Sequence, residues 1–241
     1  MAARYWSIVI IYVLMQLSGI VAVPALLAVG SFDSAQQASY FWIFASFIVA
    51  LIVILILLIP ERGQSLAFNK PKMPWPNSIA WVFIGFALAY AGQIAAGLIE
   101  QNLLGIDTAS ENTAQIIELV NSMPAFVIIV AVIGPILEEL VFRKAIFGSL
   151  YKRTNFFIAA IISSLIFAAV HLDFTHLLVY TMIGFVFAYL YVKTGRIIVP
   201  IIVHSIMNAF VVGIQVLFQD EIERMMREAE SALILLVQGL M

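Results

Sequence analysis

The sequence contains an apolar stretch that carries four charges, PAFVIIVAVIGPILEELVFRKAIFGSL at residues 124–150. It exceeds the roughly 20 residues that a helix needs to cross a bilayer. Within it lie Glu138, Glu139, Arg143 and Lys144. An ionisable side chain inside a membrane span is costly and marks a functional site by default. The stretch therefore predicts both a membrane fold and the position of a site.

The composition of the whole chain points the same way. Of 241 residues, 63% are hydrophobic and 11% are charged, whereas a soluble domain has about 45–50% apolar and about 25% charged residues. This excludes an ordinary soluble domain, a disordered chain and a nucleic-acid-binding protein with a basic surface. The absence of cysteine excludes a disulfide scaffold, a thiolate metal site and a cysteine nucleophile. The predicted fold class is all-α, a polytopic membrane helix bundle.

Seven stretches are predicted to cross the membrane, and the positive charges orient them. They are Tyr5–Val29, Tyr40–Ile59, Ile79–Ile99, Pro124–Leu150, Phe156–His171, Leu177–Val192 and Ile197–Phe218. The loops 30–39 and 100–122 contain no Lys or Arg, while the loops on the other side contain several. Because cytoplasmic loops carry the excess of Lys and Arg, the N-terminus is predicted to be cytoplasmic and the C-terminus external.

Composition along the chain suggests three regions. Residues 1–77 form a two-span region with a Pro-rich cytoplasmic linker, residues 78–218 form the core, and residues 219–241 form a charged, amphipathic tail. Residues 110–122 have apolar residues at helical spacing, so we expect a helix along the outer surface. The tail is too short to cross the membrane and is expected to form an interfacial helix.

Helical spacing sorts the polar residues of the spans. Glu139 and Arg143 stand at i and i+4, so they share a face and are expected to pair. Glu138 lies about 100° around the helix and has no cation of its own there. His204 and Asn208 also stand at i and i+4, so both side chains point one way. The spacing thus separates a supporting ion pair from a free carboxylate and an imidazole–amide pair.

These residues predict the activation of water. Glu138, His171 and His204 fall in one layer near the middle of the bilayer. In one interpretation Glu138, helped by His171, takes a proton from water, while His204 and Asn208 donate hydrogen bonds to an oxyanion. In the other, Glu138, His171 and His204 hold Zn²⁺ with water in the fourth position. The residues alone do not separate the two.

Three motifs carry a family resemblance. Glu138-Glu139-Leu-Val-Phe-Arg143 resembles the E-E-x-x-x-R motif of the CAAX-protease and bacteriocin-processing (Abi) family, which includes the Ras-converting type of prenyl-protein endopeptidase. The segment Phe167–His171 resembles its F-x-x-x-H motif, and His204–Asn208 its third motif, H-x-x-x-N or H-x-x-x-D. The resemblance covers roughly residues 124–210 and leaves the first three spans matched only in being hydrophobic.

The resemblance implies an intramembrane endopeptidase and assigns roles to its residues. Glu138 would be the catalytic base, His171 its partner, and His204 and Asn208 the oxyanion donors. Glu139 and Arg143 would support them, and Phe167 is expected to pack beside the site.

The remaining expectations concern partners and place. The substrate is expected to be a hydrophobic peptide or membrane protein, with or without a lipid, and the lipid bilayer is the other partner. No nucleic acid is expected to bind. The cofactor is none, or zinc in the metal interpretation, and the expected location is the plasma membrane of a bacterium. The alternative function is a catalytically silent membrane scaffold, or an immunity or regulatory protein.

Overall fold

The chain is helical throughout the part that the structure describes. This computed structural model describes residues 3–61, 71–106 and 110–218, together with residues 221 and 224. No strand occurs in these ranges, which confirms the all-α class. The α-helices are α1 Ala3–Ala28, α2 Ala35–Leu58, α3 Trp75–Leu104, α4 Glu111–Ser122, α5 Phe126–Ile128, α6 Gly134–Glu138, α7 Gly148–Tyr151, α8 Phe156–Ala169, α9 Leu177–Thr194 and α10 Ile198–Leu217.

Five helices of the described chain are long and apolar enough to cross a membrane. They are α1, α2, α3, α9 with the 3₁₀ turn before it, and α10, and they confirm the membrane class. The other two predicted spans differ from a standard spanning helix. Helix α8 has only 14 residues, and residues 126–151 are helical but divided. The count of seven crossings and the orientation stay predictions.

The divided helix alternates between two hydrogen-bond registers. Two π-helical segments, Ile129–Ile133 and Glu139–Phe147, separate α5, α6 and α7. The residues at each junction keep right-handed helical backbone angles. Residues 126–151 therefore form one continuous helical rod. The stretch is thus helical as predicted, but its change of register was not predicted. Pro135 offers a physical reason for the first π segment, because proline lacks an N–H and its ring crowds the carbonyl four residues earlier.

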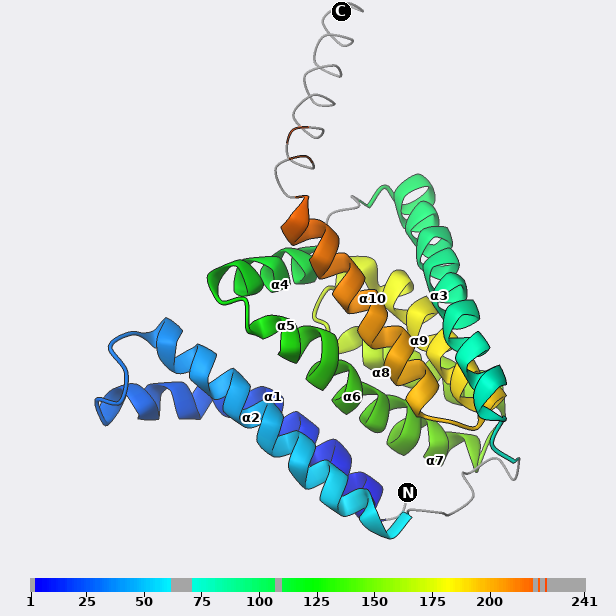
Figure 1. Cartoon of the computed structure of the whole chain (residues 1–241), viewed down its shortest axis with the longest axis horizontal. Coiled ribbons are helices and arrows are strands. Elements are labelled where there is room, and N and C mark those ends of the chain that lie inside the picture. Colours follow the sequence, from blue (N-terminus) through cyan, green and yellow to red (C-terminus); the bar gives the residue numbers. More distant parts are fainter. Residues whose placement is uncertain (1–2, 62–70, 107–109, 219–220, 222–223, 225–241) are drawn as a thin grey trace, which may run out of the picture.

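The first two helices pack directly against this rod (Figure 1). In α1, Tyr12 meets Phe142 edge to face at a centroid distance of 5.6 Å. In α2, Phe44 lies 4.7 Å from Phe126 between ring centroids. Buried residues of α1, α2 and the rod form one apolar cluster. The α1–α2 hairpin is thus one wall of the body that holds the polar residues.

Helices α8, α9 and α10 contact the rod on its other side, and α3 packs against α9 and α10 (Figure 1). Small residues let them approach closely, as is usual between membrane helices. A Cβ on Gly85 of α3 would lie 2.6 Å from Leu190 Cδ1 of α9, and one on Gly184 would lie 2.9 Å from Ser164 Oγ of α8. Side chains larger than glycine would push α9 away from both neighbours.

Two connections bear on the predicted topology. Arg196, between α9 and α10, donates from Nε to the Met73 carbonyl before α3 at 2.8 Å, and its guanidinium lies 4.1 Å from the Trp75 ring centroid. These two linkers therefore meet, which is compatible with the prediction that both lie on one side of the membrane. Residues 110–122 do contain a helix, α4, capped by the Ser110 hydroxyl. The predicted tail helix lies outside the described residues, apart from residues 221 and 224.

Candidate active site

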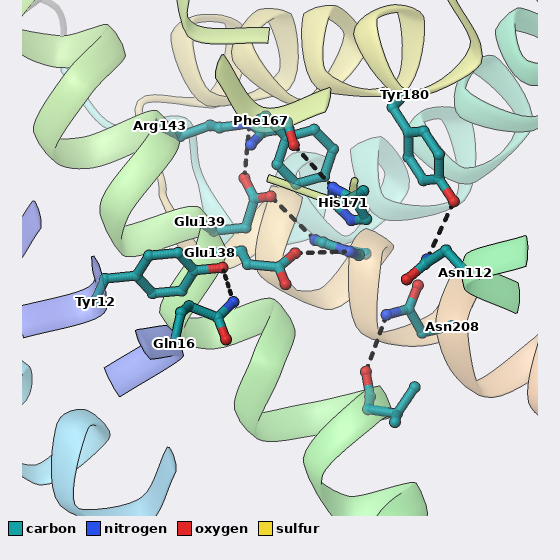
Figure 2. Close-up of polar contacts among 12 residues, drawn as sticks. Tyr12, Gln16, Asn112, Glu138, Glu139, Arg143, Phe167, His171, Tyr180 and Asn208 are labelled. Atoms are coloured by element: carbon teal, nitrogen blue, oxygen red, sulfur yellow. Dashed lines mark hydrogen bonds and ion pairs between the residues drawn. The ribbon is translucent and has the colours of Figure 1, made fainter. Parts of the chain in front are cut away.

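The polar residues of three helices meet beside the divided rod (Figure 2). Glu138 ends α6, and Glu139 and Arg143 lie in the π-helical segment after it. His204 and Asn208 come from α10, and His171 comes from the turn just after α8. The predicted residues thus lie around one region, although they are not all joined by direct contacts.

Glu139 joins the rod to α10. Its carboxylate pairs with Arg143, with Nε and Oε2 3.2 Å apart, which confirms the predicted ion pair. Its other oxygen lies 3.1 Å from His204 Nδ1, a contact that spacing within one helix did not predict. With the Nδ1 proton directed at Glu139, the opposite nitrogen of the His204 ring faces Glu138. A carboxylate bonded to one imidazole nitrogen in this way sets which nitrogen is available for chemistry.

The Arg143 guanidinium is buried among aromatic rings. The residue is 1% exposed, and its carbon Cζ lies 4.2 Å from the Phe167 ring centroid and 5.2 Å from that of Phe187. Within the described chain its nitrogens lack well-aligned hydrogen-bond acceptors. The Glu139 charge and the two ring faces therefore have to offset its desolvation. The phenyl ring of Phe167 lies beside the site, as predicted, and also covers a charge.

Glu138 is the less constrained carboxylate. Its side chain is 19% exposed, and Oε2 lies 3.6 Å from His204 Nε2, which is too long for an ordinary hydrogen bond. Figure 2 shows Tyr12 and Gln16 of α1 directed toward it, and Gln16 Nε2 donates to the Tyr12 hydroxyl at 3.2 Å. Glu138 interacts electrostatically with this hydroxyl. Tyr12 and Gln16 were not among the predicted site residues, although a polar pair at i and i+4 in an apolar span could have pointed to them.

His171 is oriented by its own helix and by α9. Its Nδ1 donates to the Phe167 carbonyl at 2.8 Å, which leaves Nε2 free of that bond. Its ring stacks on Tyr180, with centroids 4.4 Å apart and planes 23° apart. The Phe167 ring contacts both imidazoles, 4.6 Å from His171 and 5.9 Å from His204 between centroids. The aromatic side chains thus hold the two histidines at fixed positions.

The Tyr180 hydroxyl is tied to the segment around the start of α4. Asn112 Nδ2 donates to it at 3.1 Å, and the Ser110 hydroxyl lies 3.3 Å away. Ser110 also donates to the Asp173 carboxylate at 2.7 Å, and Asp173 is buried. None of these residues was among the predicted site residues, because their contacts join positions more than 60 residues apart. The network connects α4 to the turn that carries His171.

Asn208 is held by the backbone of the rod. Its Nδ2 donates to the Val130 carbonyl at 2.9 Å, within the first π-helical segment. A side-chain amide has two N–H donors, so one remains for another acceptor. Asn208 and His204 are therefore two side chains of α10 that each bind the rod, one through Val130 and one through Glu139.

The predicted zinc ligands do not assemble into a metal site here. Across the ranges that the structure describes, no group of three His, Cys, Asp or Glu side chains has the placement needed to hold a metal ion. Of the three candidates, Glu138 approaches His204, while His171 stacks against Tyr180. As placed, these side chains do not fit a zinc site.

A second carboxylate–histidine cluster lies apart from these residues. Glu100 was expected in an external loop, but α3 continues past it and it is 2% exposed. Its carboxylate accepts from His176 Nδ1 at 2.9 Å and from the backbone N–H groups of Leu178 and Val179 at 2.9 and 3.2 Å. It therefore caps the N-terminus of α9, where exposed N–H groups favour a negative charge.

Comparison with known proteins finds one matching family and similar bacterial membrane proteins. The family described as "Type II CAAX prenyl endopeptidase Rce1-like" matches residues 120–210. The chain is 40% identical over 246 residues to "Putative membrane peptidase YdiL" of Bacillus subtilis (strain 168), covering 100% of this chain and 99% of that protein. It is 35% identical over 237 residues to "Membrane-embedded CAAX protease MroQ" of Staphylococcus aureus (strain USA300), covering 94% and 96%. No solved structure matches.

Proposed function

The chain belongs to the Rce1-like family of type II CAAX prenyl endopeptidases, as the three motifs predicted, and on this premise we propose that it hydrolyses a peptide bond within the membrane. It is an integral membrane protein of the protease class, with relatives in bacteria. The proposed substrate is a hydrophobic peptide or a membrane protein, with or without a lipid.

The observation that carries the proposal is the difference between the two adjacent carboxylates. Glu139 is fully buried and bound to both Arg143 and His204, whereas Glu138 is partly exposed and its nearest histidine nitrogen, His204 Nε2, lies 3.6 Å away. A general base has to reach water and accept its proton. Glu138 meets that requirement, while the carboxylate oxygens of Glu139 are already bound to Arg143 and His204.

In the proposed mechanism, water bound beside Glu138 loses a proton to its carboxylate as the water oxygen bonds to the peptide carbonyl carbon. The proton then passes from Glu138 to the amide nitrogen as the carbon–nitrogen bond breaks. His171, whose Nδ1 is fixed on Phe167, would accept a hydrogen bond from this water through Nε2. This role follows the motif and is supported by the orientation of the ring.

The negative charge that develops on the carbonyl oxygen would be stabilised by His204 and Asn208. Donors that are already in place stabilise such an oxyanion without reorganisation. The Glu139 carboxylate beside His204 Nδ1 compensates the charge of a ring that is protonated on both nitrogens. Asn208 would use the amide N–H that is not bound to Val130.

The test of this function compares peptide termini in membranes of cells that produce either the intact protein or the Glu138→Ala variant at equal abundance. We expect specific termini that disappear with the variant, and the lost termini identify the substrate. A matched control is Glu118→Ala, which removes an exposed carboxylate of α4. If the three profiles agree while deletion of the protein still alters the cell, the scaffold alternative replaces the peptidase proposal.

Metal dependence is tested separately on the purified protein in lipid. In the metal-free mechanism, exhaustive chelation leaves the cleavage rate unchanged. Loss of cleavage on chelation, with recovery on adding Zn²⁺, would instead support the zinc interpretation and require the side chains of Glu138, His171 and His204 to rearrange. Measured zinc content after purification provides a readout that does not depend on activity.

A further inference from the structure

The Val130 carbonyl occupies an unusual position in the rod. In the π-helical segment, the Gly134 N–H donates to the Ile129 carbonyl, five residues earlier. The same register assigns the Val130 carbonyl to the N–H of residue 135. That residue is Pro135, which has no N–H to donate. The register therefore leaves Val130 without its backbone partner, and Asn208 donates to it instead at 2.9 Å.

The neighbouring glycine permits this arrangement. A Cβ on Gly134 would lie 3.0 Å from the Ile129 carbonyl oxygen, closer than an ordinary contact. Glycine at 134 therefore allows the shifted register, and proline at 135 prevents the free carbonyl from being used by its own helix. A carbonyl that is removed from water and has no donor is unfavourable, because its lost hydration is not replaced. A donor from another helix is therefore favoured at this position.

We infer that Pro135 is a positioning residue that reserves the Val130 carbonyl for Asn208 and thereby aims the Asn208 amide into the site. Once one N–H is fixed on Val130, the direction of the second N–H and of the amide oxygen is set. The consequence for catalysis rests on the proposed function, in which Asn208 donates to the oxyanion. The hydrogen-bond exchange itself does not depend on any activity.

The Pro135→Ala substitution tests this exchange because it supplies the missing donor. In the π register the new N–H of residue 135 reaches the Val130 carbonyl, and in an α register the Gly134 N–H reaches it. In both cases the Val130 carbonyl accepts a hydrogen bond from its own helix, so Asn208 is no longer its sole donor. The expected variant is at least as stable as the original chain, but its kcat falls by up to about 100-fold, the effect of a displacement near 1 Å, while KM changes less than kcat.

The decisive measurement is a double-mutant cycle on unfolding in lipid or detergent, made without substrate. Asn208→Ala should lower the denaturant midpoint clearly in the original chain and much less in the Pro135→Ala background. Pro24→Ala serves as the control, because it also removes a proline from a helix interior but lies in α1. In that background the Asn208→Ala shift should keep its full size.

Two outcomes would overturn the inference. A second substitution at Asn208 keeps the test possible if the first variant does not fold. Equal Asn208→Ala shifts in the original chain and in the Pro135→Ala background would show that the carbonyl was never reserved. An unchanged kcat in an active Pro135→Ala enzyme would show that Pro135 does not aim Asn208. If the Asn208→Ala variant does not fold, Asn208→Leu, which is similar in size and has no donor group, replaces it in the same cycle. Coupling in stability together with no peptidase activity in the intact protein would reject the proposed function and keep this inference.

Discussion

Two carboxylates, Glu100 and Glu138, each lie beside a histidine in a membrane helix, yet their surroundings are opposite. Glu100 is buried and accepts three hydrogen bonds, including one from His176. Glu138 is partly exposed, and its closest histidine nitrogen, on His204, is 3.6 Å away. One carboxylate is satisfied by the fold, and the other is left with capacity for a further partner.

The difference shows how residue type alone misleads in a membrane protein. Any ionisable residue in a span is a candidate for function, and by that rule both carboxylates qualify. The number of donors around each one separates them. Glu100 joins α3 to the start of α9 and so holds the turn that carries Asp173, whereas Glu138 stays partly exposed and is 3.6 Å from its nearest histidine nitrogen.

The largest effect is expected for Glu138→Gln. This change keeps the shape of the side chain but removes the base, so the cleavage rate should fall by about 10²–10⁴-fold while the unfolding midpoint stays within error. Both are measured on protein purified into lipid, with Glu118→Gln as the exposed control. A variant that retains its rate would place Glu138 with Glu100 as a structural carboxylate.

Arg143→Met is expected to have the next largest effect, and to act on stability. It leaves Glu139 buried without its cation, which by analogy with buried ion pairs lowers the free energy of unfolding by about 3–5 kcal/mol. The double variant Arg143→Met, Glu139→Gln should recover part of this loss, because no unpaired charge remains. Denaturant titration in detergent measures both. Equal stability of the single and double variants would contradict the ion-pair role.

Glu100→Gln should weaken the fold without removing the chemistry. Glutamine loses the charged acceptor, so His176 and the first N–H groups of α9 are less well satisfied, and the expected loss is about 1–3 kcal/mol. The cleavage rate per folded molecule should change much less than with Glu138→Gln. A rate loss as large as that of Glu138→Gln, at unchanged stability, would make Glu100 part of the reaction.

The smallest effect is expected for Tyr180→Phe. It keeps the ring stacked on His171 but removes the hydroxyl bonded to Asn112, a bond contributing about 0.5–1.5 kcal/mol. The rate should therefore fall only several-fold, whereas Tyr180→Leu, which also removes the stacked ring, should reduce it further. Comparing the two separates the stack from the hydrogen bonds. Equal rates for both variants would show that stacking does not orient His171.

Much of the fold could be predicted because membrane spans are long apolar stretches whose signal is local. The Glu139–Arg143 pair was predictable in the same way, since the two residues are four apart on one helix. The His204–Glu139 contact was not, because it joins residues 65 apart. The π register could not be predicted from hydrophobic spacing, which reports which face is buried and not which carbonyl each N–H binds. Glu100 was misplaced because a charge ended the apolar run before α3 itself ended.

The buried charge cluster also has a consequence for how the chain enters the membrane during synthesis. A charged residue at the centre of a segment opposes its insertion by about 2.5–3.5 kcal/mol, and the rod carries Glu138, Glu139 and Arg143. Their partners Phe167, Phe187 and His204 are made only afterwards. The two apolar helices α1 and α2 are synthesised first. Because they pack against the rod, they offer it a protein surface to pack on when it enters the membrane. We therefore expect assembly of the rod to be completed only after α10 has left the ribosome.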